Sequence, residues 1–244
     1  MGIALRTVIG LGALAVVTVP AAAAPATTGA PRAAAAPVVQ VRYDMNEPAE
    51  ATVMVDSSGN GLDAPVDQAG LDTGVEYDGA VGYYWAFRSP TKPPPAPERV
   101  IQVADNPLLD PGSDTFTVEI RYRTDRPFGN IIQKGQSASR GGQWKIQNPE
   151  GKPSCLFKGS VGRVATRSTV ALNDQRWHTL TCVRSATRVT MYVDGVYMSR
   201  KSGVTGPIDN KIPMTIGGKI NCDQFRTTCD YFTGMIDYVQ LSRG

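Results

Sequence analysis

Residues 115–123 alternate apolar and polar side chains, and this period of two constrains the fold more than any other feature of the chain. Every second residue from Phe116 to Tyr122 is apolar, and polar or charged residues lie between them. Such alternation places one face of an extended strand in a core and the other in solvent. No helix-length window of residues 38–244 repeats apolar residues at three and four positions, so the sequence predicts a β protein.

A β-hairpin is predicted at residues 188–201, where two strand-like runs flank Asp194-Gly195, a dipeptide that accepts the positive φ angles of a type I′ turn. Gly, Pro, Asn and Asp separate the further strand candidates. These are residues 38–43, 62–66, 82–87, 100–103, 130–134, 144–147, 154–158, 163–168, 178–184, 214–216 and 231–241. Many short strands between turns predict an all-β, two-sheet antiparallel β-sandwich or jelly roll. The internal repeat of a β-propeller is absent from the sequence.

The first 37 residues are expected to lie outside this domain. Residues 1–24 have the basic start, apolar middle and small-residue end of a secretory signal peptide. A transmembrane anchor is the alternative, but the apolar run at 7–19 is shorter than the roughly 20 residues that a span needs. Residues 25–37 are rich in Ala and Pro and predict a flexible leader. We therefore expect one domain at residues 38–244, secreted to the extracellular space without membrane insertion.

Charge excludes one class of partner. The net charge is +3, and the basic residues are scattered rather than clustered. A run or face of basic residues is the usual mark of nucleic-acid binding, so no nucleic-acid partner is expected.

The chain has four cysteines, Cys155, Cys182, Cys222 and Cys229. An even number in an exported chain predicts disulfides, for which three connectivities are possible. We favour Cys155–Cys182, because both lie in strand-like stretches that we expect to be adjacent, and Cys222–Cys229, which encloses a short polar loop. A zinc site is the alternative, but the chain has no C-x-x-C pair and only one histidine, His178.

Five short motifs occur in the order found in one known family. They are DSSGNG at 56–61, DTFTVE at 114–119, QRWHT at 175–179, YVDG at 192–195 and FTGMID at 232–237. In this order they resemble the landmarks of laminin-G-like jelly-roll domains of the concanavalin A-like superfamily, over residues 38–244. The cysteines beside Trp177-His178 resemble those of secreted actinobacterial members. The resemblance implies two curved antiparallel sheets, of which relatives often use the concave one to hold sugars, but the same fold also serves enzymes.

The resemblance also implies a structural calcium, because relatives place one where an N-terminal loop meets the final strand. Calcium takes several oxygen ligands from carboxylates and backbone carbonyls. The side chains of Asp56 and Asp237 and the carbonyl of Asn60 are the expected ligands. An Asx turn in which Asp56 caps its own backbone is the alternative. Members of the family commonly carry a second acid where Tyr238 stands here, so the site would be weaker than theirs.

A sugar site needs aromatic rings that stack on apolar sugar faces and planar polar groups that bond to hydroxyls. Tyr84, Trp85, Arg140 and Trp144 are the candidates, and a polysaccharide or glycoconjugate is the expected partner. The alternative is that the aromatic side chains fill the core of the sandwich.

We expect no enzymatic activity. Glycosidases hold two carboxylates across the scissile bond, and the Glu-x-Asp run that supplies them in one branch of the superfamily is missing, since Arg121 stands two residues after Glu119. Glu47 and Glu50 flank a proline, and His178 lacks an evident Ser or Cys partner. Two alternatives stay open, a polysaccharide lyase or hydrolase and a protein-interaction domain without sugar binding.

Overall fold

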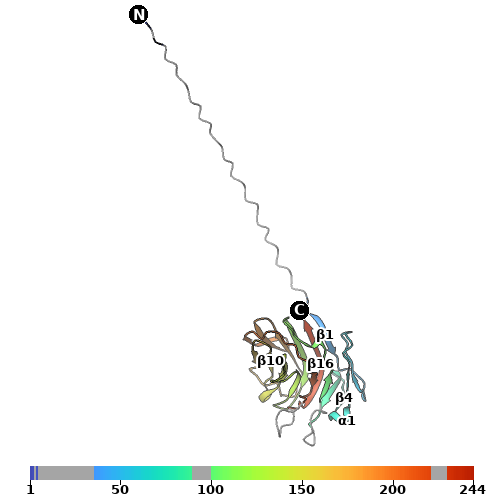
Figure 1. Cartoon of the computed structure of the whole chain (residues 1–244). Coiled ribbons are helices and arrows are strands. Elements are labelled where there is room, and N and C mark those ends of the chain that lie inside the picture. Colours follow the sequence, from blue (N-terminus) through green and yellow to red (C-terminus); the bar gives the residue numbers. More distant parts are fainter. Residues whose placement is uncertain (3, 5–35, 90–99, 221–229) are drawn as a thin grey trace. The chain divides into compact units, whose positions relative to one another are not determined.

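The structure is a computed structural model that describes residues 1–2, 4, 36–89, 100–220 and 230–244 (Figure 1). The chain divides into two units, residues 1–34 and 35–244, and the fold described below is that of the second unit. Most of the predicted signal peptide and of the predicted leader lie outside the described residues, as do Cys222 and Cys229. Within the described ranges, no helix is both long and apolar enough to cross a bilayer.

Antiparallel strands form the second unit, which confirms the predicted all-β sandwich. The larger sheet has the order β14-β13-β12-β7-β16-β5-β4, and β1 also pairs with β16. Its strands are β1 (Val38–Tyr43), β4 (Thr73–Asp78), β5 (Gly82–Phe87), β7 (Phe116–Arg123), β12 (His178–Arg184), β13 (Arg188–Val193), β14 (Val196–Ser202) and β16 (Gly234–Arg243).

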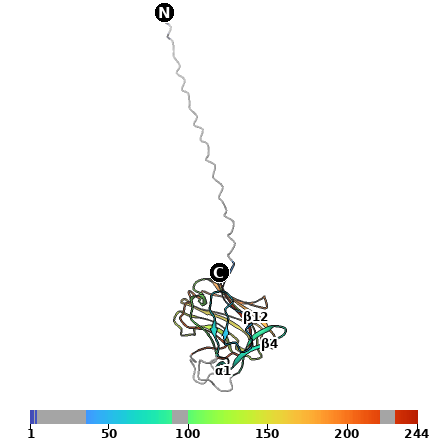
Figure 2. The same ribbon diagram turned by 90° about the vertical axis from the view of Figure 1, so that its right-hand side faces the viewer.

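The second sheet has six strands in the order β11-β10-β9-β8-β15-β6. They are β6 (Ile101–Val103), β8 (Asn130–Lys134), β9 (Gln143–Gln147), β10 (Ser154–Lys158), β11 (Arg163–Arg167) and β15 (Met214–Ile216). Short elements complete the described part of the fold: the β2–β3 ladder (Val53–Met54 with Ala64–Pro65), the helix α1 (Gln68–Leu71) and two 3-10 turns, η1 (Pro107–Leu109) and η2 (Pro149–Gly151). In both views α1 lies at the end of the domain away from the C-terminus (Figure 1 and Figure 2).

The two strongest sequence signals are confirmed. Along β7 the side chains alternate between buried and half-buried from Phe116 to Arg123. The hairpin of β13 and β14 turns at Asp194 and Gly195, whose φ angles are 51° and 77°. The predicted strand at 62–66 is reduced to two residues, since Pro65 has no N–H to donate to a longer ladder. Strand β4 is not among the predicted strands, because Gly74 and two acids interrupt its apolar alternation.

A disulfide links the two sheets through the core. Cys155 and Cys182 are both fully buried, and their Cα atoms lie 5.8 Å apart. The predicted pairing is confirmed, but the predicted adjacency is wrong, because β10 belongs to the six-stranded sheet and β12 to the larger one. Alternation explains the arrangement, since each cysteine points inward from its own sheet.

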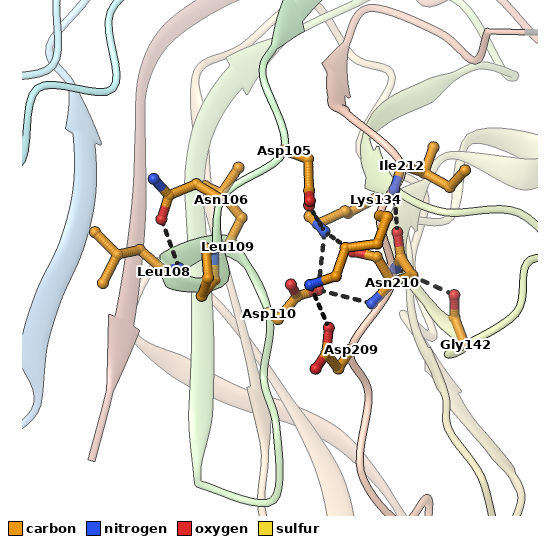
Figure 3. Close-up of polar contacts among 12 residues, drawn as sticks. Asp105, Asn106, Leu108, Leu109, Asp110, Lys134, Gly142, Asp209, Asn210 and Ile212 are labelled. Atoms are coloured by element: carbon orange, nitrogen blue, oxygen red, sulfur yellow. Dashed lines mark hydrogen bonds and ion pairs between the residues drawn. The ribbon is translucent and has the colours of Figure 1, made fainter.

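One cation is buried at an end of the core (Figure 3). The Nζ atom of Lys134, fully buried on β8, donates to Asp105 Oδ1 at 2.8 Å, Asp110 Oδ1 at 2.9 Å and the carbonyl of Asn210 at 2.5 Å. Three acceptors use all three N–H groups of the ammonium. The cluster therefore ties the segment after β6 and the segment before β15 to β8.

Candidate functional site

The outer face of the larger sheet carries a network of charged and aromatic side chains. Arg121, which points outward from β7, donates from Nη1 to Asp237 Oδ2 at 2.7 Å. On the same face the hydroxyl of Tyr238 donates to Glu119 Oε1 at 2.8 Å. The guanidinium of Arg42 lies 5.0 Å from the centre of the Tyr238 ring. Alternation along β7 produces this face, because the apolar side chains of the strand point to the core.

A hollow with a volume of about 530 Å³ opens at one end of this face. The ends of β5, β7 and β16 meet there with the turn before β12. It is lined by Glu76, Ala86, Phe87, Arg88, Ser89, Arg123, Thr124, Asp125, Arg126, Gln175, Thr233, Gly234 and Met235. Its volume falls within the 300–1,000 Å³ or so that is typical of small-molecule sites.

Glu76 is engaged on both carboxylate oxygens. Arg88 Nη2 donates to Oε1 at 2.7 Å, and the hydroxyl of Tyr84 donates to Oε2 at 3.2 Å. Burial and the charge of Glu76 raise the pKa of Tyr84. The tyrosine is therefore held protonated as a hydrogen-bond donor and orients the carboxylate at the wall of the hollow.

Arg123 lies on the floor of the hollow and has only weak acceptors. Its Nε and Nη2 atoms contact the sulfur of Met235 at 3.2 Å and 2.9 Å. Its Nη1 lies 3.9 Å from Asp78 Oδ2, beyond hydrogen-bonding distance. The guanidinium also lies 5.0 Å from the centre of the Trp177 ring.

Trp177 lies beside the hollow on the outer face of the sheet and is half-buried. Its ring is 5.4 Å from the Arg121 guanidinium and meets the Tyr84 ring edge-on at 5.5 Å between centres. His178 pairs with Tyr122 on the inward face of β12, so the preceding residue, Trp177, points outward. Counting back by the period of two from β12 is the signal that identifies this ring.

Two of the predicted stacking residues are core residues instead. Trp85 and Trp144 are fully buried, and their indole N–H groups donate to Glu47 Oε2 and to the carbonyl of Leu109, each at 3.0 Å. Both lie on inward positions of their strands, so neither ring is available to stack on a ligand. The alternative of a core role therefore holds for both.

The other two predicted residues lie far from one another in the fold. Tyr84, on β5 of the larger sheet, is buried and supports the wall of the hollow. Arg140 is exposed in the loop between β8 and β9 of the six-stranded sheet. The structure thus keeps Tyr84 near the candidate site and places Arg140 away from it. Glu76, Arg88, Arg123 and Gln175 are hollow residues that the sequence pattern did not identify, because three of them are ordinary charged residues of strands or strand ends.

The predicted calcium ligands each have a protein partner. Asp56 accepts backbone N–H bonds from Arg42, Ser58 and Leu62, each at 3.0 Å, in the manner of an Asx turn. Burial acts to raise the pKa of Asp56, but these donors outweigh it and lower the pKa. Burial raises the pKa of Asp237 against the opposing effect of its Arg121 partner.

The side chain of Asn60 donates to the carbonyl of Gln40 at 2.9 Å. Across the described ranges, no group of three or more His, Cys, Asp or Glu side chains gathers as metal ligands. Carboxylates retain further lone pairs beyond these bonds, and the calcium site stays a prediction.

His178 is clamped between two carboxylates. Its Nδ1 lies 2.8 Å from Asp194 Oδ2 and its Nε2 lies 3.1 Å from Asp174 Oδ1. The ring therefore joins the turn before β12 to the β13–β14 hairpin. The same turn presents Gln175, in the left-handed region with φ of 65°, to the hollow.

A second, much smaller hollow lies on the outer face of the six-stranded sheet. It has a volume of about 60 Å³ and is lined by Asn130, Gln133, Gln136, Ser137, Gln143, Lys145, Lys219 and Asp230. This volume corresponds to about two water molecules. A third hollow has a volume of about 340 Å³ and is lined by Glu50, Gln68, Ala69, Asp72, Thr73 and Arg88. The hollow of about 530 Å³ has the greatest volume of these three and is the candidate site for a ligand of sugar size.

A sequence profile described as the concanavalin A-like lectin/glucanases superfamily (Laminin_G_3) matches residues 98–244. No curated protein matches the chain.

Several solved structures share the fold at low identity. Domain 4 of AbnA, a GH43 extracellular arabinanase from Geobacillus stearothermophilus, in complex with arabinotriose, is 14% identical with a TM-score of 0.58, over 85% of this chain and 93% of that one. The binding domain of Paraclostridial Mosquitocidal Protein 1 is 16% identical with a TM-score of 0.59, and the match covers 84% of this chain and 47% of that one. A structure from work on botulinum neurotoxin type C, a toxin whose cell entry depends on interaction with two ganglioside molecules, is 13% identical with a TM-score of 0.58. The match covers 84% of this chain and 48% of that one. This chain spans about half the length of the toxin chains.

Proposed function

Because the chain belongs to the concanavalin A-like lectin/glucanases superfamily, we propose that it is a secreted, non-catalytic protein that binds the sugar part of a polysaccharide or glycoconjugate. The hollow on the outer face of the larger sheet is the binding surface. The observation that carries the proposal is the combination of planar polar side chains that line one hollow of about 530 Å³ with the ring of Trp177, which lies 5.0 Å from the guanidinium of one of them, Arg123.

The side chains of the hollow suit the chemistry of sugars. Glu76 accepts hydrogen bonds, Arg88 and Arg123 donate them, and Gln175 does both. Hydroxyl groups of a sugar ring need both kinds of partner at fixed positions. The half-buried ring of Trp177 supplies an apolar surface next to these groups.

A binding role fits the state of the titratable groups. Burial and the charge of Glu76 raise the pKa of Tyr84, and burial together with Glu119 raises the pKa of Tyr238 to about 12. A tyrosine that acts as a base in a lyase needs the opposite shift. The two carboxylates of the hollow, Glu76 and Asp125, are each paired with an arginine.

The comparisons support the class of ligand. The arabinanase domain, whose structure was solved with arabinotriose, is covered almost completely by this chain. One binding domain of botulinum neurotoxin DC was solved in complex with SialylT, at 12% identity and a TM-score of 0.56 over 84% of this chain. Identities this low establish the fold, so the ligand of this chain rests on the hollow itself.

Export and calcium belong to the same proposal. The signal-peptide pattern of residues 1–24 supports secretion. A calcium ion at Asp56 and Asp237 would stabilise the domain rather than contact the sugar, since neither residue lines the hollow.

Binding is tested with the secreted chain on a glycan array that includes plant, bacterial and animal polysaccharides, followed by calorimetry on the hits. Arg88→Ala and Gln175→Ala should each weaken binding about tenfold, since each removes hydrogen bonds to the ligand. Arg140→Ala, on the other sheet, is the matched control and should bind as the wild type does. Release of reducing ends or unsaturated products would instead favour a polysaccharide-active enzyme, and silence on every glycan would favour a protein-interaction domain.

A further inference from the structure

The arginines that line the hollow have more unused hydrogen-bonding capacity than its acids. Three arginines, Arg88, Arg123 and Arg126, line it, against two acids, Glu76 and Asp125. Both oxygens of Glu76 already accept hydrogen bonds, and Asp125 lies 3.3 Å from the guanidinium of Arg126. Part of the acceptor capacity of the acids is therefore already used by protein groups, whereas each arginine keeps N–H groups to donate.

Arg123 is the least exposed of the three arginines, and it alone has no oxygen atom of the described residues within hydrogen-bonding distance of its guanidinium. A guanidinium offers five N–H groups in a rigid fork, and its preferred partners are oxygen anions. Here two of its nitrogens contact a thioether sulfur, which is a weak acceptor, and the nearest carboxylate oxygen, on Asp78, is 3.9 Å away. Only about a quarter of the side chain is exposed, at 27%, so bulk water satisfies it incompletely.

The position of Arg123 is fixed before any ligand arrives. The strand β7 holds its backbone, the Met235 sulfur contacts one edge of the guanidinium, and the Trp177 ring lies 5.0 Å from it. A fixed fork loses little side-chain entropy on binding and is suited to a planar, bidentate acceptor such as a carboxylate.

We propose that the hollow recognises an acidic sugar, a uronate or a sialate, whose carboxylate is bound by the guanidinium of Arg123. The inference rests on the proposed function, because it names the class of glycan that the same hollow takes. Trp177, which is not among the lining residues of the hollow, orients Arg123 through its ring. Glu76 and Arg88 then face the ring hydroxyls.

The test compares acids with their own neutral esters. Tetragalacturonic acid and 3′-sialyllactose are titrated by calorimetry against the wild-type chain, each beside its carboxyl methyl ester. We expect at least one acid to bind about tenfold or more tightly than its ester, with affinity falling as salt rises. The esters keep the ring and its hydroxyls, so the difference isolates the carboxylate.

Variants locate the contact. Arg123→Met should abolish the preference for acid over ester, and Arg123→Lys should retain part of it, because lysine keeps the charge but loses the fork. Arg140→Met, exposed in the loop between β8 and β9 of the six-stranded sheet and away from the hollow, should leave the preference in place. Unchanged thermal melts identify variants that are correctly folded, and the Lys variant covers the case in which the Met variant is not.

The possible results distinguish a failure of this inference from a failure of the proposed function. Equal binding of acid and ester, or an acid preference that survives both Arg123 variants, overturns the inference while the proposed function stands. The same holds if only neutral or sulfated oligosaccharides bind. If no oligosaccharide of any kind binds, the proposed function itself fails, and the inference fails with it.

Discussion

Cys155 and Cys182 join the two sheets of the sandwich across its core, although they are 27 positions apart in sequence, and their Cα atoms lie 5.8 Å apart. Neither sheet pairs with the other through backbone hydrogen bonds at these strands, since β10 and β12 have their neighbours within their own sheets. The covalent link therefore adds to side-chain packing as a connection between the layers.

Removal of this link should destabilise the domain. In the double variant Cys155→Ala, Cys182→Ala the disulfide no longer restricts the conformations of the unfolded chain, so the unfolded state gains entropy. For a loop of this length the free energy of unfolding should therefore fall by about 3–4 kcal/mol. Guanidinium denaturation of the variant and of the oxidised wild type measures the difference. Coincident denaturation midpoints would contradict the prediction.

Lys134→Met should also be strongly destabilising, because it leaves Asp110 and Asp105 beside an apolar side chain without their shared cation. Breaking a buried ion pair from one side costs about 3–5 kcal/mol. The control is Lys211→Met, which removes an exposed ion pair with Asp209 and should leave stability nearly unchanged. Urea denaturation of both variants decides, and equal curves would count against a structural role for the buried cluster.

Two tryptophans should separate binding from stability. Trp177→Ala removes the half-buried ring beside the hollow and should weaken glycan binding about tenfold with a small effect on folding. Trp144→Phe removes the indole bond to Leu109 and leaves a cavity, so stability should fall by about 1–3 kcal/mol while binding is retained. Thermal melts and calorimetry on the same preparations measure both quantities, and a reversed pattern would exclude the outer-face site.

Asp174 should make the stability of the folded domain depend on pH in the acid range. Burial acts to raise its pKa, but hydrogen bonds from the backbone and side chain of Arg176 and from His178 lower it from 3.8 to about 2. A depressed pKa in the folded state contributes stability that is present above pH 3.8 and is lost as the pH falls toward 2. Asp174→Asn should therefore flatten the pH dependence of the urea midpoint in this window. Parallel curves for variant and wild type would refute the assignment.

Calcium should raise the thermal midpoint if Asp56 and Asp237 hold an ion, because a ligand that binds only the folded state stabilises it by mass action. Melts in calcium chloride, magnesium chloride and a chelator make the comparison. The shift should be specific for calcium and absent in Asp237→Asn. Superimposable melts in all three solutions would remove calcium from the proposal.

The fold could be predicted from local patterns where those patterns are strong. The alternation in residues 115–123 identified β7, and Asp194-Gly195 identified a hairpin, because both depend on near neighbours in sequence. The pairing of β16 with β7, β5 and β1 depends on contacts distant in sequence, and no local pattern encodes it. The disulfide illustrates the limit: the pairing of the cysteines was predictable, but not that it crosses between sheets.

The candidate site was less predictable, because residue type does not say which face of a strand a side chain occupies. Trp85, Trp144 and Trp177 share one chemistry, yet two are in the core and one is on the outer face. A shift of one residue in register reverses these positions. The unmet donors of Arg123 depend on Met235 and Asp78, which are brought close only by the folded sheet.

The antiparallel pairing of β1 with β16 sets Val38 opposite Arg243, so the start of the first strand of the domain lies beside the end of its last strand. Gly234, at the other end of β16, lines the hollow, roughly 30 Å along the strand from Arg243 at about 3.4 Å per residue. A surface, bead or fusion partner attached to the domain next to Val38 or Arg243 would hold it by one pole and leave the opposite pole, with the proposed sugar-binding hollow, pointing into open solution. Immobilisation at this pole is thus the orientation in which captured glycans should meet the least obstruction.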